Sequence, residues 1–194
     1  MTIDFSVHNR QTAPAAAEST LAGAESAFGF LPNLLGVFAE SPAVLKAYLT
    51  LGELFGSTSF SDTERQTVLL TISRYNDCRY CVAAHSTIAD MQKVPAEIAD
   101  AVRTDTPITD PRLEALRAFT IAMIDKRGWV SDADTAEFLA AGFSKANVLD
   151  VVLAVSFKTL SNYTNHIADT PLDAAFAAKQ WTPPLQNAVP NSTE

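Results

Sequence analysis

The chain has 194 residues, of which 47% are hydrophobic and 19% charged, so it can bury one substantial core. Its net charge of −8 argues against a nucleic-acid or anionic-lipid partner, since both carry negative charge. Residues 1–20 show no basic segment followed by an apolar run, and no later stretch approaches about eighteen uninterrupted apolar residues. We therefore expect a cytoplasmic protein with no membrane partner.

Helical patterns occupy most of the chain and strand patterns are nearly absent, so we expect an all-α fold. One helix start is marked by Ser61 or Asp62, with Glu64 or Gln66 placed to reach back to free backbone amides. In chain order, the predicted helices cover residues 14–28, 41–56, 61–75, a helix capped by Asn76 and Asp77, 95–104, 110–128, 131–142, 144–169 and 171–181.

The segment 144–169 is expected to lie nearest the centre of the core, because it is apolar around much of its circumference between Val148 and Leu160. Residues 182–194 are rich in proline and polar side chains, which leaves them little to bury. We predict a single helical domain over residues 1–181, followed by a C-terminal tail.

Both cysteines of the chain and one of its three histidines lie within NDCRYCVAAH, residues 76–85. At about 100° per residue, Cys78, Cys81 and His85 fall within an arc of about 60° on one helix face. A thiol in a first turn lies among unpaired N–H groups, which favour the thiolate. His85 lies one turn beyond Cys81 and could relay its proton, whereas Cys78 has no such neighbour. This spacing predicts that Cys81 is the attacking thiol.

Two other interpretations of the motif remain open. A zinc site prefers four ligands and this stretch supplies three, and His166 could be the fourth only if the fold brings it close. Alternatively, the cysteines are small core residues and His85 is a buried, hydrogen-bonded histidine, although three such residues on one arc make this less attractive.

The segment ERQTVLLTISRYNDCRYCVAAHSTIAD resembles the core motif of the alkyl hydroperoxidase D (AhpD) and carboxymuconolactone decarboxylase superfamily, particularly its peroxidase-related branch. The similarity extends through FGFLPNLLGVFAESPAVLKAY upstream and LSNYTNHIADTPLD downstream, so it covers most of the chain. The resemblance implies an AhpD-like helical bundle with the CxxC at the start of a core helix. It also implies a homo-oligomer (dimer, trimer or hexamer) and thiol-dependent peroxide reduction, in which Cys81 attacks and Cys78 resolves.

One position departs from that superfamily's pattern. Members with well-understood chemistry carry a glutamate twelve residues before the first cysteine, and this chain has Gln66 there. Gln66 can orient an imidazole but cannot take a proton, so a relay would run through Glu64, water or another residue. Tyr80 is either a hydrogen-bonding group near the thiols or a packed aromatic. His166 either belongs to the active site or ties a helix end to the next turn.

The sequence thus predicts an enzyme, a thiol-dependent hydroperoxide reductase whose catalytic residues are drawn from Cys78, Cys81, His85, Glu64, Gln66, His166 and Tyr80. Its partners would be a hydroperoxide substrate and an external dithiol reductant, with no metal or organic cofactor. The alternatives are another disulfide oxidoreductase, or a metal-binding or redox-sensing module.

Overall fold

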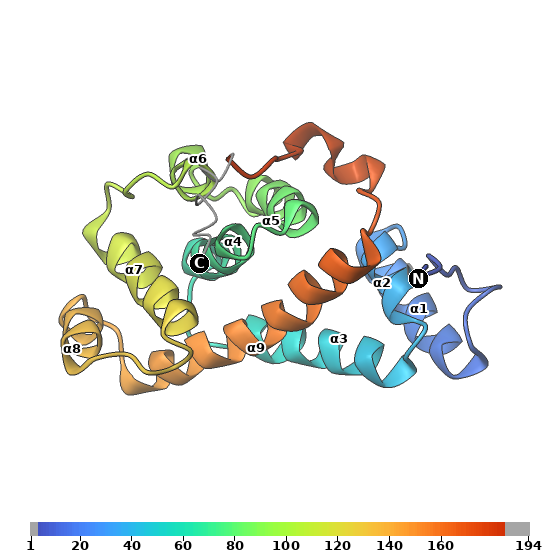
Figure 1. Ribbon diagram of the computed structural model, residues 1–194, viewed down its shortest axis with the longest axis horizontal. Helices are drawn as coiled ribbons and strands as arrows, with labels where there is room; N and C mark the ends of the chain where they lie inside the picture. The colour runs from blue at the N-terminus through green and yellow to red at the C-terminus, as the bar shows by residue number, and fades with distance from the viewer. Residues whose placement is uncertain (1–3, 185–194) are drawn as a thin grey trace, which may run out of the picture.

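The computed structural model describes residues 4–184, and these form α-helices with no β-strand among them, which confirms the all-α prediction (Figure 1). The elements are α1 (Ala15–Phe28), α2 (Asn33–Phe38), α3 (Pro42–Gly56), α4 (Asp62–Tyr75), α5 (Arg79–Met91), α6 (Ala96–Thr104), α7 (Pro111–Asp125), α8 (Asp132–Ala140), α9 (Lys145–Ala168) and the 3-10 helix η1 (Ala174–Lys179). Helix α4 lies in the middle and packs against α5, α6, α7 and α9, while α3 and α9 run alongside each other.

The connection between α4 and α5 sets the position of the CxxC motif. The predicted cap at the start of α4 is present, since Ser61 and Glu64 form a reciprocal capping box. At its other end the chain turns through Asp77, which has a left-handed φ of 52°. The backbone N–H of Cys78 then donates to the carbonyl oxygen of Ser73 at 2.9 Å. This tight turn makes Cys78 the N-cap residue of α5, where we had expected Asn76 and Asp77 to cap the helix.

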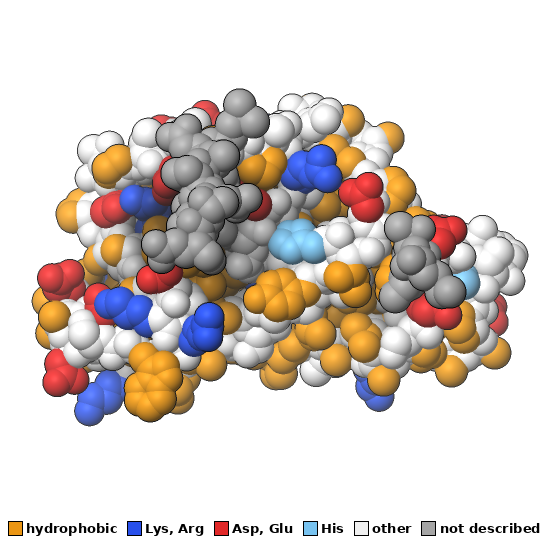
Figure 2. Space-filling model, in the orientation of Figure 1, with side chains coloured by type: hydrophobic (Ala, Val, Ile, Leu, Met, Phe, Trp, Pro, Cys, Tyr) orange, Lys and Arg blue, Asp and Glu red, His pale blue; other side chains and the backbone are white. Residues whose placement is uncertain are grey.

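Helix α9 has two different faces. Its buried face carries apolar residues near the N-terminal end and a polar set, Lys158, Ser161, Asn162 and Asn165, near the C-terminal end. Its outer face exposes Leu149, Val152, Tyr163 and Ile167. Figure 2 shows hydrophobic side chains gathered along the part of the surface where α9 and α3 lie in Figure 1. The expectation that this helix lies nearest the centre of the core is wrong: α4 holds that place, and several apolar residues of α9 face outward instead of into the core.

The predicted helix over residues 171–181 is wrong. Residues 170–173 have no regular secondary structure, and only Ala174–Lys179 form a helix, of the 3-10 type. The reason is tertiary: the Asp173 carboxylate accepts hydrogen bonds from the backbone N–H of Asn33 at 3.0 Å and from the Tyr80 hydroxyl at 2.5 Å. The predicted tail falls mostly on residues 185–194, outside the described residues, so the boundary between domain and tail stays a prediction.

Between residues 4 and 184, no single helix is long and apolar enough to cross a membrane. The bent pair formed by α8 and α9, at 112° to each other, satisfies that test by length and composition only.

Candidate active site

Cys78 and Cys81 are free thiols buried at the N-terminal end of α5, with exposed fractions of 1% and 2%. Both face α9, where the Asn165 side chain spans the pair. Its amide nitrogen donates to Cys81 Sγ at 3.2 Å and lies 3.7 Å from Cys78 Sγ. The two sulfurs also hydrogen-bond to each other. The motif therefore forms a close dithiol pair, as an intramolecular disulfide requires.

The surroundings of the pair separate its two thiols electrostatically. Burial alone would raise the pKa of the Cys81 thiol, but the neighbouring Cys78 thiol, the charge of Lys158 and the nearby polar side chains of Ser161 and Asn162 outweigh it and hold that pKa well below its usual range. The hydrogen bond to Cys81 and burial raise the pKa of Cys78. These opposite shifts favour the thiolate at Cys81 and the protonated thiol at Cys78.

His85 is buried and held at both ring nitrogens. Lys158 Nζ lies 2.9 Å from His85 Nε2, and an ammonium can only donate, so Nε2 accepts. The proton of the neutral ring is then on Nδ1, which donates to Gln66 Oε1 at 3.1 Å. Burial and the charge of Lys158 hold the pKa of His85 well below its ordinary value. The amide nitrogen of Gln66 donates in turn to Gln92 Oε1 at 2.9 Å.

This network differs from the predicted relay. The spacing indicated that His85 could accept or relay the Cys81 proton, and in the structure its two nitrogens bind Lys158 and Gln66. Gln66 orients the His85 ring through this hydrogen bond, which an amide can do without accepting a proton.

Glu64 lies away from the thiols. Its carboxylate caps α4 by accepting from the backbone N–H of Ser61, and it pairs with Arg112 at 2.9 Å. Glu64 is not among the hydrogen-bond partners of His85, so these contacts do not support a relay through Glu64. The bend between α4 and α5 brings Gln66 to the imidazole instead.

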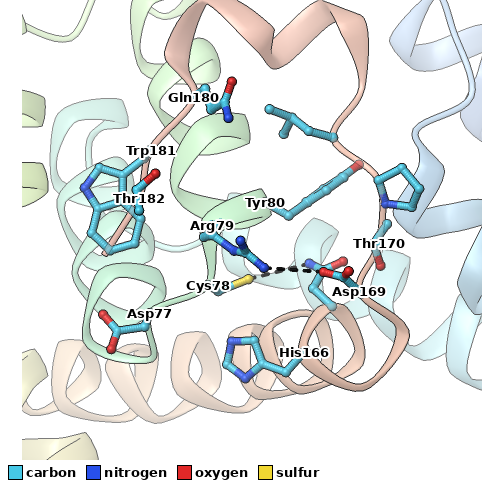
Figure 3. Close-up of a pocket in the computed structure, with 13 residues that line it drawn as sticks. Asp77, Cys78, Arg79, Tyr80, His166, Asp169, Thr170, Gln180, Trp181 and Thr182 are labelled. Carbon is cyan, nitrogen blue, oxygen red and sulfur yellow. Dashed lines mark hydrogen bonds and ion pairs between the residues drawn. The ribbon is translucent and has the colours of Figure 1, made fainter. Parts of the chain in front are cut away.

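A cavity of about 600 Å³ opens onto the dithiol from the Cys78 side. Figure 3 shows Cys78, Arg79 and Tyr80 of α5 on one wall, with His166 and Asp169 from the end of α9 on another. Cys78 lines the cavity and Cys81 lies behind it. The cavity is lined by Asp77, Cys78, Arg79, Tyr80, Asn165, His166, Asp169, Thr170, Pro171, Leu172, Gln180, Trp181 and Thr182.

The structure places Tyr80 and His166 at the cavity in different ways. Tyr80 is buried, packs edge-on against Phe176 and donates its hydroxyl to Asp173 at 2.5 Å. Burial, together with this hydrogen bond, raises the pKa of Tyr80. His166 is exposed at the rim and stacks on Tyr163 with ring centroids 6.3 Å apart. Neither side chain has a hydrogen bond to a thiol among the described contacts.

Sequence reasoning missed the contribution of α9. Lys158, Ser161, Asn162 and Asn165 all face the thiols or His85. The signal was present: these polar residues recur at spacings of three and four on the same face of a helix that is otherwise apolar inside. Among residues 4–184, no group of three or more His, Cys, Asp or Glu side chains is arranged to hold a metal ion.

Comparison with known families gives one match. Residues 42–122 match the model of the carboxymuconolactone decarboxylase family, one of the two families that the motif resembles. No curated protein matches the chain at a significant level.

Solved structures extend the likeness over most of the chain. An AhpD-core, peroxidase-related protein from Ralstonia eutropha aligns with a TM-score of 0.78 at 21% identity, covering 89% of this chain and 93% of its own. A peroxidase-related protein from a Silicibacter species gives a TM-score of 0.75 at 18% identity, covering 90% and 93%. The debrominase Bmp8, as a cysteine-to-alanine variant with 2,3,4-tribromopyrrole, gives 0.74 at 19% identity, covering 92% and 97%. At these identities the likeness shows the AhpD-like fold.

Proposed function

We propose that this protein is a thiol-dependent peroxidase that reduces organic hydroperoxides at the Cys78–Cys81 pair. The observation that carries the proposal is a pair of free thiols bridged by Asn165 beside an open cavity, in surroundings that lower the pKa of Cys81 and raise that of Cys78. Such a pair supplies a nucleophile and a resolving thiol already in contact.

In the oxidative half-reaction, the terminal oxygen of the hydroperoxide has to reach past Cys78, which lines the cavity, and the Cys81 thiolate behind it attacks that oxygen. An S–O bond forms, the O–O bond breaks, and the departing alkoxide takes a proton from water to become an alcohol. Cys78 then attacks the Cys81 sulfenic acid, and its thiol proton leaves with the hydroxyl group as water. The products are one alcohol, one water, the Cys78–Cys81 disulfide and the hydroxide ion left when water protonates the alkoxide.

In the reductive half-reaction, an external dithiol restores the pair. Its thiolate attacks Cys78 Sγ, because Cys78 lines the cavity while Cys81 lies behind it. Cys81 leaves as a thiolate, and a low pKa makes it a good leaving group. The second thiol of the reductant then displaces Cys78 and completes the reductant's own disulfide.

The cavity favours an organic hydroperoxide over hydrogen peroxide. Its volume of about 600 Å³ suits a ligand with an organic body, and Trp181 and Leu172 provide apolar walls. Two buried oxygen atoms in the lining, Asn165 Oδ1 and Thr170 Oγ1, have no hydrogen-bond partner among residues 4–184. Both can accept a hydrogen bond from a bound substrate, including the O–H of the hydroperoxide.

A peroxide panel with free-thiol counting tests this proposal. The reduced protein should lose two thiols per chain on adding a preferred organic hydroperoxide and regain both with a dithiol. Cys81→Ser should lose none. Thiols that persist against every peroxide but disappear with disulfide substrates would replace the proposal with a disulfide oxidoreductase, and stoichiometric zinc in the purified protein would favour a metal-binding module.

A second candidate function is reductive dehalogenation of an aromatic compound. The debrominase Bmp8 matches nearly the whole chain, and the cavity beside Cys78 carries the aromatic side chains of Tyr80 and Trp181. Attack of the Cys81 thiolate on bromine would give a sulfenyl bromide and an aryl anion that takes a proton. Cys78 would then release bromide and close the disulfide. Bromide release from a brominated pyrrole by the reduced protein, and not by Cys81→Ser, would establish this activity.

A further inference from the structure

Lys158 is a fully buried lysine in the middle of α9, with 0% of its surface exposed. Its ammonium lies 2.9 Å from His85 Nε2 and 5.6 Å from the ring centre of Phe157. Its contacts within residues 4–184 include no ion pair with a carboxylate. Because a buried ammonium without a counter-charge is costly, the fold must offer it an anion or another compensation.

The titratable groups that face Lys158 leave one candidate for that anion. From α5 these groups are His85, Cys78 and Cys81, and Tyr48 of α3 lies near both cysteines. His85 is neutral, and burial raises the pKa of Tyr48, so its phenol is neutral as well. Cys78 keeps its proton. Cys81 is therefore the remaining group able to carry a negative charge beside Lys158.

The other elements packed against α9 direct their charged groups elsewhere. On α4, Glu64 pairs with Arg112, Arg65 with Asp62, and Arg74 with Asp105. On α7, Arg117 pairs with Glu114. Helix α2 has no charged side chain.

We propose that Lys158 is a positioning residue of the dithiol site: its buried ammonium is the counter-charge of the Cys81 thiolate and fixes His85 in the tautomer that donates to Gln66. This inference deepens the proposed function. The ion pair between Lys158 and Cys81 does not require peroxidase activity, but its use in catalysis rests on the proposed function. Gln66 cannot accept a proton, so a cation supplied by α9 takes over the task of keeping Cys81 ionised.

The ion pair also affects the redox balance of the site. Reduction of the disulfide takes two electrons and one proton and gives the Cys78 thiol and the Cys81 thiolate; the electrons come from an external dithiol, which becomes a disulfide. The thiolate restores the partner of Lys158, so the charge stabilises the reduced state. A dithiol with a stabilised reduced form is more oxidising.

The test is a titration of the Cys81 thiolate by ultraviolet absorbance and by the pH dependence of iodoacetamide alkylation, neither of which involves a peroxide. Lys158→Met removes both the charge and the hydrogen bond to His85, whereas Lys158→Gln removes the charge but keeps a donor to His85. The control is Lys46→Met, the same substitution at an exposed lysine on α3. In the first two variants the thiolate titration should move upward, and alkylation at pH 7 should slow about tenfold for each pH unit of that shift. Lys46→Met should behave as the wild type.

Thermal unfolding separates a charge effect from a structural one. Lys158→Met should melt no lower than the wild type, since Cys81 can take a proton and no charge is left buried. A folded Lys158→Gln whose thiol titrates like the wild type would overturn the proposal, as would a wild-type Cys81 that titrates at or above about 8.5. If the thiolate shift is found but no peroxide is consumed, the role of Lys158 stands and the proposed function fails.

Discussion

The two ends of the protein interior are built in contrasting ways. At the end formed by α7, α8 and the start of α9, aromatic rings stack face to face: Phe138 lies 4.2 Å from Phe119 and 4.5 Å from Phe143 between ring centroids. At the other end, α5 and the second half of α9 bury Lys158, His85 and the dithiol. The first region fills space with apolar surface, and the second holds charged and polar groups in a fixed arrangement.

Helix α9 contributes to both regions. Val151 and Ala154 pack into the aromatic end, and from Lys158 onward the same face becomes polar and lies against the thiols. The difference teaches that fold stability and thiol reactivity depend on separate parts of one helix. Changes at one end should therefore leave the other largely unaffected, because mutations at distant sites without shared partners act independently.

The largest expected effect is the loss of turnover on removing the nucleophile. Cys81→Ser should lower peroxide reduction by about 10⁴-fold or more, as expected when a covalent nucleophile is removed, because a serine hydroxyl is not ionised in this site. Its free energy of unfolding, measured with urea, should change far less. Retained turnover in this variant would show that Cys81 is not the nucleophile.

Truncation at the aromatic end should have the opposite profile. Phe138→Ala should lower the free energy of unfolding by about 3–5 kcal/mol, because Phe138 is fully buried between two stacked rings. Below its melting transition, the alkylation rate of Cys81 should match the wild type. A changed alkylation rate in the folded variant would show that the two ends are coupled.

Stability should depend on pH through the thiol end. Hydrogen bonding from Cys78 and the charge of Lys158 overcome burial to depress the pKa of Cys81, so below about pH 8.5 the unfolded chain binds one more proton than the folded chain. This contribution to stability is complete above about pH 8.5 and is lost as pH falls through the folded pKa, by up to about 1.4 kcal/mol per unit.

Burial and Lys158 lower the pKa of His85, which adds a second slope of the same sign below about pH 6.5. Urea unfolding at a series of pH values should show both slopes. Cys81→Ala should flatten the first, whereas a wild-type curve that is flat between pH 6.5 and 8.5 would mean that Cys81 is not held as a thiolate.

The outer face of α9 offers a third environment for comparison. It exposes Leu149, Val152, Tyr163 and Ile167, and we expect the chain to self-associate, with light scattering giving at least twice the chain mass of 20.8 kDa. A monomer mass at micromolar concentration would contradict self-association, and the conclusions about the two interior regions would not change.

The smallest effect is expected at Glu64. Glu64→Gln removes a partly exposed ion pair with Arg112 and weakens a helix cap, so the free energy of unfolding should fall by about 1 kcal/mol or less. Peroxide turnover and its pH profile should stay unchanged, since Glu64 does not contact His85. A shifted pH profile would restore the relay through Glu64.

The sequence predicted the helices well because caps and apolar spacing are local signals. Ser61 with Glu64 is an example that the structure reproduces. The helix prediction failed at residues 171–181, where Asp173 is held by Asn33 and Tyr80 from distant segments. The same limit applied to the site: the motif placed Cys78, Cys81 and His85 on one face, but the partners of His85 depend on how α9 packs against α5. No local pattern connects Lys158 with a histidine 73 residues earlier.

The central claim, that Cys81 attacks and Cys78 resolves, is tested most directly by trapping the intermediate. Reduced Cys78→Ser protein is treated with one equivalent of an organic hydroperoxide and then with a dimedone-type reagent, and the labelled peptide is mapped by mass spectrometry. The account predicts one adduct per chain on Cys81, with turnover stopping after about one cycle. An adduct on Cys78 in Cys81→Ser protein, with no adduct on Cys81 in Cys78→Ser protein, would contradict it and reverse the two roles.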